Sequence, residues 1–101
     1  DTMTINLRDS EDGSSHYAVL TVVISMDKSN EDYSKLGLEG IEAGLYDSNI
    51  KSIINDVIRT YTYEEIHNQP EQAQKEILEK LQGFFDSSMI VDVGFPTITC
   101  E

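Results

Sequence analysis

Paired carboxylates are the side chains in this sequence whose type and spacing come closest to those of a catalytic site. Glu64 and Glu65 are adjacent, and Glu76 and Glu79 lie three residues apart. Two carboxylic acids act as acid and base only where their surroundings separate their pKa values. The first pair falls in the first turn of an expected helix, where acids complement the helix dipole, and the second on a solvent-facing side. We therefore assign no catalytic residue and expect that this protein is not an enzyme.

Metal and cofactor motifs are not recognisable either. His16 and His67 have no Cys, His or carboxylate at metal-ligand spacing, and we expect them to be solvated surface residues. An EF-hand frame around Gly13 fails, because it places Arg8 at the first position, where an acid is required. The glycines of LGLEGIEAG follow no strand and precede no Lys-Ser/Thr, so they do not match a phosphate-binding loop. We therefore predict no metal and no cofactor.

The composition indicates one acidic globular domain. The chain has 101 residues, with 19 Asp and Glu against seven Lys and Arg, and a net charge of −12. A chain of this size buries roughly 60–70% of its unfolded surface, so we expect residues 1–101 to form a single domain. This charge repels phosphate backbones, which argues against nucleic-acid binding. The single cysteine, Cys100, excludes an intramolecular disulfide, and no stretch approaches the roughly 18 apolar residues of a membrane span.

Alternation of apolar and polar residues predicts three strands, over residues 2–8, 17–26 and about 89–99. A polar loop with an Asp-Gly pair separates the first two, which therefore form a hairpin. The third strand returns after the helices and must pair with the hairpin to complete the sheet. Pro96 lacks a backbone N–H, so this strand lies at an edge or carries a bulge there.

Helical periodicity predicts two amphipathic helices joined by a short one. The first, over residues 47–61, has one apolar face. Thr62 and Glu65 have the spacing of a capping box for the short helix. Asn68 and Glu71 repeat that spacing at the start of the last helix. Before the first helix lies a segment with three glycines, each of which costs about 1 kcal/mol of helix stability, so we expect a weak or irregular helix there.

The order strand, strand, helices, strand predicts an α+β fold: a small, mainly antiparallel three-stranded sheet with the helices packed on one face. The apolar faces of these elements predict the buried core. The predicted core residues are Leu20, Val22, Ile24, Ile50, Ile54, Val57, Ile77, Leu78, Leu81, Phe84, Val91 and Val93.

Four apolar residues around the glycine-rich segment are not needed by this core. They are Tyr33, Leu36, Leu38 and Leu45. They form our candidate surface for a partner or for self-association, and the alternative is that they cap the end of the core. Both interpretations stay open from the sequence alone.

Three stretches resemble the extracytoplasmic domain of the flagellar basal-body-associated FliL family. INLRDSEDGSSHYAVLTVVISM resembles its opening hairpin, NIKSIINDVIRTYTYEEI its central helix with the break after it, and EILEKLQGFFDSSMIVDVGFPTITCE its closing helix and terminal strand. Together, and in this order, they cover nearly the whole chain.

The resemblance implies a stomatin/SPFH-like fold and a non-catalytic accessory protein of the flagellar motor, with a role in motility and chemotaxis. It implies a position on the extracytoplasmic side of the inner membrane, with a membrane helix expected upstream of residue 1. It implies stator proteins of the MotA/MotB type as partners and a homo-oligomer that forms when the domain is anchored. The alternative is a small acidic cytoplasmic secretion chaperone that dimerises and binds an effector segment, and the upstream sequence would distinguish the two.

Overall fold

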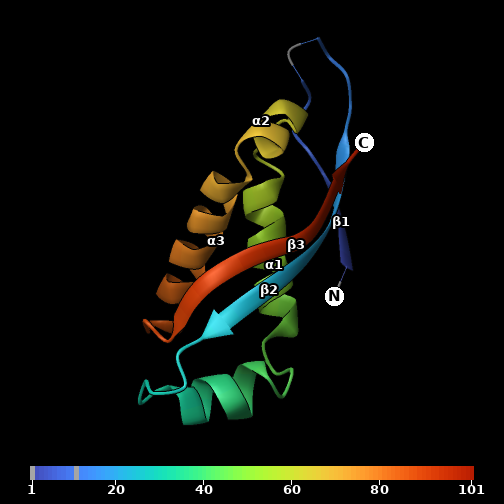
Figure 1. Cartoon of the computed structure of the whole chain (residues 1–101). Coiled ribbons are helices and arrows are strands. Elements are labelled where there is room, and N and C mark those ends of the chain that lie inside the picture. The colour runs from blue at the N-terminus through green and yellow to red at the C-terminus, as the bar shows by residue number, and fades with distance from the viewer. Residues whose placement is uncertain (1, 11) are drawn as a thin grey trace.

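Two strands, four helical segments and a final strand follow one another along the chain in the computed structural model, which describes residues 2–10 and 12–101 (Figure 1). The elements are β1 (Thr2–Asn6), β2 (Tyr17–Met26), the π-helix η1 (Tyr33–Ile41), α1 (Asp47–Ile58), α2 (Tyr63–Asn68), α3 (Pro70–Phe85) and β3 (Ile90–Cys100). Together they form an elongated body of 48 × 21 × 20 Å.

The three strands form one antiparallel sheet in the order β1-β2-β3. The central strand is therefore β2, and the last strand in the chain pairs with it from Ala18↔Cys100 to Met26↔Ile90. Both outer strands are edges. The predicted α+β class, with a three-stranded antiparallel sheet completed by the terminal strand, is confirmed.

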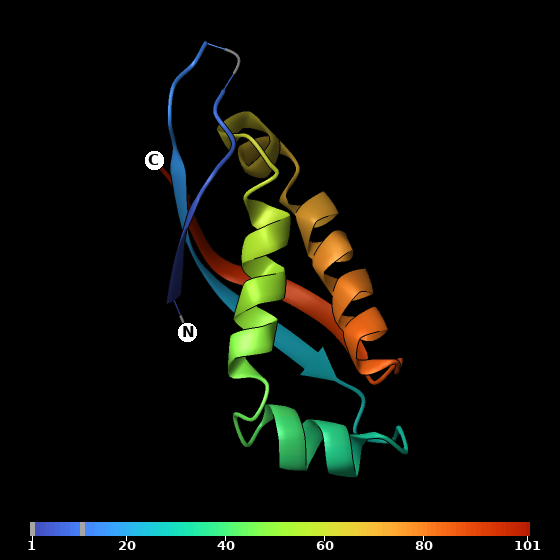
Figure 2. The ribbon, with the colours of Figure 1, turned by 180° about the vertical axis from the view of Figure 1, so that it is seen from behind.

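The two long helices, α1 and α3, lie side by side across one face of the sheet (Figure 2). They present their apolar stripes to the sheet and to each other, as a one-sided α+β arrangement requires. The π-helix lies beyond the end of the sheet, below the start of α1. The short helix α2 lies at the opposite end, close to the hairpin loop.

Most of the predicted core is buried between the sheet and the two long helices. The predicted residues found buried are Leu20, Ile50, Ile54, Val57, Ile77, Leu81 and Val93. Val22, Ile24 and Leu78 are partly buried and pack against this core. The core is completed by Ile5, Leu7, Ala18, Ile58, Tyr61, Ile66, Ala73, Phe85, Met89 and Ile90.

The prediction that Phe84 belongs to the core is wrong, because its side chain is 47% exposed. The buried residues of α3 are Ala73, Ile77, Leu81 and Phe85, each four positions after the last. A step of four residues exceeds one turn of 3.6, so this buried line drifts around the helix. At the last turn the line runs through Phe85, and Phe84, about 100° away from it, falls outside.

The prediction that Val91 belongs to the core is also wrong, because it is 51% exposed. The β2–β3 register shifts between Ser25↔Asp92 and Met26↔Ile90, so Val91 is the extra residue of a bulge. A bulge reverses the alternation of side chains beyond it, and Ile90 takes the buried position. A second register shift lies in the segment that contains Pro96, where a bulge or an edge was predicted, and β3 is indeed an edge strand.

Only one of the two predicted capping boxes forms. The Thr62 side chain accepts a hydrogen bond from the Glu65 backbone N–H, and the Glu65 side chain accepts one from the Thr62 backbone N–H. The box predicted for Asn68 and Glu71 is wrong, because Asn68 is the last residue of α2. A single residue separates the two helices, so Gln69 is the N-cap residue of α3, without a side-chain cap hydrogen bond.

Replacing Leu81 with Ala should lower the free energy of unfolding by about 2–5 kcal/mol, because the buried side chain leaves a cavity. Replacing Phe84 with Ala is the matched control on the same helix, and should cost about 1 kcal/mol through its lost aromatic contacts. Urea unfolding of both variants measures the difference. Equal losses would contradict the placement of the core line along α3.

Deleting Asp92–Glu101 should abolish cooperative unfolding. The deletion removes nearly all of the ladder that β3 makes with β2, together with the buried Val93. Thermal melting followed by circular dichroism measures the effect, and Thr99→Ala at an exposed position of the intact strand serves as the control. A truncated domain that melts like the full one would show that the sheet does not depend on β3.

Candidate interaction surface

Three exposed apolar side chains belong to elements at the end of the molecule where η1 lies. Leu38 on η1 is 54% exposed, Leu45 in the turn after it is 71% exposed, and Phe84 comes from the last turn of α3. We call these three residues the end surface. Two of them, Leu38 and Leu45, were in the candidate surface expected from the sequence, while Phe84 had been assigned to the core.

The other two candidate residues, Tyr33 and Leu36, are partly buried and pack against the core. The Tyr33 hydroxyl donates a hydrogen bond to a carboxylate oxygen of Glu42 at 2.6 Å. This bond and the nearby negative charge raise the pKa of Tyr33. The four residues thus divide, two capping the end of the core and two facing solvent.

Glycines allow the irregular helix to approach its neighbours closely. A Cβ atom at Gly37 would lie 2.6 Å from a ring carbon of Tyr33, and one at Gly40 would lie 2.6 Å from a ring carbon of Tyr46. Contacts this short are not tolerated, so larger side chains at these two positions would displace the rings. The weak or irregular helix predicted here is the π-helix η1, a rare helix with i→i+5 hydrogen bonds.

Phe84 of the end surface packs in an aromatic cluster with Tyr46 and Phe85. The Tyr46 ring packs edge-on against Phe85 with the ring centroids 5.0 Å apart, and Phe84 packs edge-on against Phe85 at 4.9 Å. Tyr46 and Phe84 are 6.4 Å apart. Phe84 is therefore held in place by two rings while nearly half of it faces solvent.

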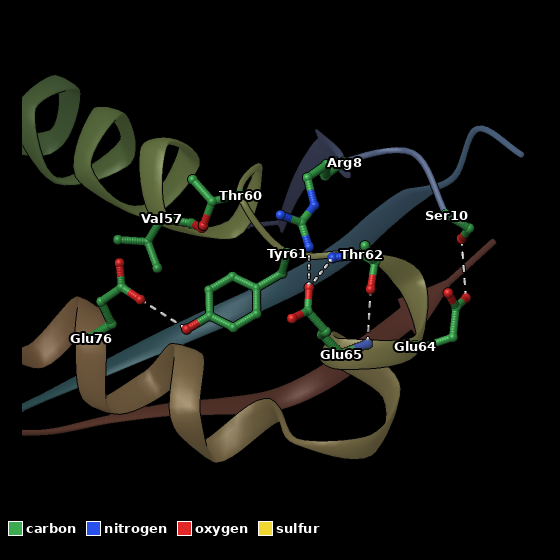
Figure 3. A network of polar contacts seen from close by, with 9 residues as sticks. All are labelled: Arg8, Ser10, Val57, Thr60, Tyr61, Thr62, Glu64, Glu65 and Glu76. Atoms are coloured by element: carbon green, nitrogen blue, oxygen red, sulfur yellow. Dashed lines mark hydrogen bonds and ion pairs between the residues drawn. The ribbon is translucent and has the colours of Figure 1, made fainter. Parts of the chain in front are cut away.

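A polar junction at the opposite end joins the end of α1, the start of α2 and the segment after β1 (Figure 3). The Arg8 backbone N–H donates to the Tyr61 carbonyl at 2.9 Å, and its guanidinium donates to Glu65 at 3.0 Å. The Thr62 backbone N–H donates to the same Glu65 oxygen at 2.9 Å. These contacts, the backbone bond from Thr62 first, lower the pKa of Glu65.

The carboxylates that resembled an acid–base set have structural partners in this junction. The Tyr61 hydroxyl donates to Glu76 at 2.8 Å, and burial together with this bond raises the pKa of Tyr61 to about 12. The Ser10 hydroxyl donates to Glu64 at 3.1 Å. Three of the four acids therefore hold segments together, while Glu64 and Glu65 line one surface hollow and Glu76 and Glu79 line another.

Both histidines lie against the ring of Tyr63. His16 in the hairpin loop is 4.7 Å from it between centroids, and His67 stacks on it at 5.7 Å. Within residues 2–10 and 12–101, no group of three or more His, Cys, Asp or Glu side chains is arranged to hold a metal ion. Over the same residues, no helix has the length and apolarity needed to cross a membrane.

The structure is a small α+β domain whose carboxylates stabilise its own junctions, and it exposes large apolar side chains both at the η1 end and on the strands, at Tyr17, Val23 and Val91. The family model for the flagellar basal body-associated protein FliL matches residues 1–99. The chain therefore belongs to the FliL family, as the three sequence stretches indicated, and is a flagellar basal-body-associated protein. Comparison with curated proteins finds no match.

Replacing Thr62 with Ala should lower the free energy of unfolding by about 1 kcal/mol, because the α2 N-terminus loses its side-chain cap. Thr62→Ser retains the hydroxyl and is the matched control, with less than half of that loss. Chemical denaturation of the two variants measures both effects. A Ser variant as unstable as the Ala variant would show that the methyl group matters and the cap does not.

Glu65→Gln should reveal a pH-dependent contribution of the junction. The pKa of Glu65 is lowered in the folded state from its ordinary value of 4.5, so its charge stabilises the fold above that value, and this stabilisation is lost as the pH falls through the folded pKa. Gln keeps an oxygen that can accept the bond from the Thr62 backbone N–H. We expect the wild type to be more stable than the variant at pH 7 and the difference to vanish in acid. A difference that stays constant down to low pH would contradict the assignment.

Proposed function

We propose that this domain is an accessory of the flagellar motor that binds the torque-generating stator and supports it in motility and chemotaxis. The family match over residues 1–99 is the observation that carries this proposal. The partners we propose are stator proteins of the MotA/MotB type. The role is mechanical, since it rests on contacts between proteins and requires no reaction at this domain.

We further propose that residues 1–101 work as a single domain on the extracytoplasmic side of the inner membrane, held there by a membrane helix outside this stretch. Copies anchored in this way are confined to a plane, which raises their local concentration. A contact too weak to persist in solution then becomes effective. This expectation supports a homo-oligomer that assembles around the stator.

The end surface is the part of the domain best suited to the contact between copies. Leu38, Leu45 and Phe84 expose apolar area at one end, and burying such area on association is favourable. Glu39 and Glu42 lie on or beside η1, and the net charge of −12 opposes the approach of two copies. Charge repulsion is screened beyond roughly 8 Å at physiological salt, so added salt should strengthen the contact.

A ring of these domains would act on the stator by binding one of its states better than another. A ligand shifts an equilibrium only by its difference in affinity for the two states. An oligomer that binds the active, extended stator more tightly would therefore raise the fraction of active stators. This mechanism needs several copies in register, which is why the contact between copies is the step to test.

Leu45→Asp and Leu38→Asp should weaken cross-linking between copies of the anchored protein and reduce swimming. Each places a charge where apolar area is buried on association. Val91→Asp is the matched control, because Val91 is exposed to a similar degree but lies on β3. Cross-linking in cells measures the contact between copies, swimming in soft agar measures motility, and copurification with the stator proteins measures stator binding.

Sedimentation of the isolated domain provides the second measurement. We expect a monomer at low salt, with association that increases as salt is added and is lost in Leu45→Asp. Self-association would be excluded by two results together: an isolated domain that is strictly monomeric at all salt concentrations, and leucine variants that both swim like the wild type. Failure to copurify with the stator proteins would remove the stator role itself.

A further inference from the structure

The edge of the sheet formed by β1 presents unpaired backbone groups. The Leu7 N–H donates to the His16 carbonyl on the β2 side. Successive backbone groups of a strand point to opposite sides, so the N–H and C=O groups of Thr4 and Asn6 face away from β2. Both residues are exposed, and within residues 2–10 and 12–101 no strand lies beyond β1 in the sheet.

The same row of outward groups already has a partner at one end. The Arg8 N–H belongs to this row and donates to the Tyr61 carbonyl, which forms a parallel bridge between Arg8 and Thr62. At Arg8, the outward backbone groups of this strand thus already pair with another segment of the chain. At Thr4 and Asn6, no segment of the described chain pairs with them.

Two adjoining hollows follow this open edge between β1 and α1. The first, of about 390 Å³, is lined by Thr4, Asn6, Leu7, Asn55 and Arg59. The second, of about 150 Å³, is mainly apolar, and its lining is Met3, Val22, Ile24, Ile41, Asp47, Ile50, Lys51 and Ile54. Sequence neighbours line the two hollows, Met3 and Thr4 on the strand and Ile54 and Asn55 on the helix.

The flank of α1 that faces this groove is basic, in a chain with only seven cations. Lys51, Asn55 and Arg59 are spaced by four residues, so they lie along one side of the helix. Arg59 makes no ion pair with the residues that the structure describes. Asp47 is the only carboxylate among the residues that line the two hollows.

The two edges of the sheet differ in how they resist pairing. The β3 edge contains Pro96, which cannot donate a hydrogen bond, and two register shifts. Both features hinder the addition of a strand. The β1 edge has neither a proline nor a charged residue between Met3 and Leu7, and its register with β2 is regular.

We propose that the β1 edge and the groove beside it bind an extended acidic segment of another protein, which adds to the sheet as a fourth strand. Its backbone pairs with Thr4 and Asn6. One apolar side chain enters the hollow beside Met3 and Ile54, and a carboxylate meets Arg59. Backbone pairing provides the affinity in this mode of recognition, and the alternate side chains provide the selectivity.

A second copy of this chain fits the edge less well. Antiparallel pairing of two β1 edges would bring the α1 flanks of both copies to one seam, with Lys51 and Arg59 of each facing those of the other. Like charges across an interface are unfavourable. An acidic segment provides the complementary charge, and this site is separate from the end surface.

The test uses a short peptide in which threonine alternates with one valine and one glutamate, made in both sequence orders, and a counterpart with lysine in place of glutamate. Amide signals of the domain are followed by NMR up to about 1 mM peptide, a range in which weak binding is detected. We expect the acidic peptide to shift the signals of Thr4, Asn6 and Asn55, and the lysine peptide to leave them in place.

Three variants identify the contacts. Arg59→Glu should weaken binding about tenfold or more, whereas Lys80→Glu, at an exposed cation of α3, should change it less than about twofold. Thr4→Pro removes one outward donor without removing a bond to β2, so it should abolish binding. Unchanged amide signals of β2 and β3 will show that this variant is folded.

Three results with the peptides would overturn the proposal. They are no shift at Thr4 or Asn6 with either order of the acidic peptide, equal shifts with the lysine peptide, and an Arg59→Glu variant that binds as well as the wild type. Shifts at Thr4 and Asn6 that grow with protein concentration, in the absence of peptide, would overturn it in favour of a second copy. None of these results depends on the flagellar proposal.

Discussion

The pairing of β3 with β2 is the interaction on which the rest of this structure depends. It makes β2 the central strand and turns a two-stranded hairpin, which alone is marginally stable in water, into a sheet wide enough to hold two helices. The strand also brings Ile90 and Val93 under α3. Over the completed three-stranded sheet, α1 lies on the β1 side and α3 on the β3 side (Figure 2). The positions of the end surface and of the β1 groove both follow from that arrangement.

The polar residues of this domain are used mainly to join its own segments. Arg8, Thr62 and Glu65 connect the hairpin to the start of α2, and Tyr61 connects the end of α1 to α3 through Glu76. These bonds engage Glu65 and Glu76, two of the carboxylates whose spacing came closest to that of an acid–base pair. The chain that they hold together belongs to the FliL family.

The elements and most of the core followed from the sequence, because apolar periodicity reports which face of a strand or helix is buried. The errors occurred where that periodicity is interrupted. A bulge turns Val91 outward, the drift of the buried line excludes Phe84, and the single residue between α2 and α3 leaves Asn68 no room to act as a cap. Leu38 and Leu45 were predicted as a surface because the core did not need them. The β1 groove was not predictable, since it forms only when a strand and a helix some 50 residues apart meet.

The long separation between β2 and β3 also determines when this domain can fold. Ala18 pairs with Cys100, about 80 residues later in the chain. Contacts so distant in sequence slow folding, because the closure of a long loop precedes the gain from pairing. During synthesis, β2 must therefore wait with the backbone groups of one edge unpaired until the last strand has emerged. The strong negative charge keeps such partly folded chains apart and soluble. The acidity of the sequence does not specify the fold, but it protects the chain until folding is complete.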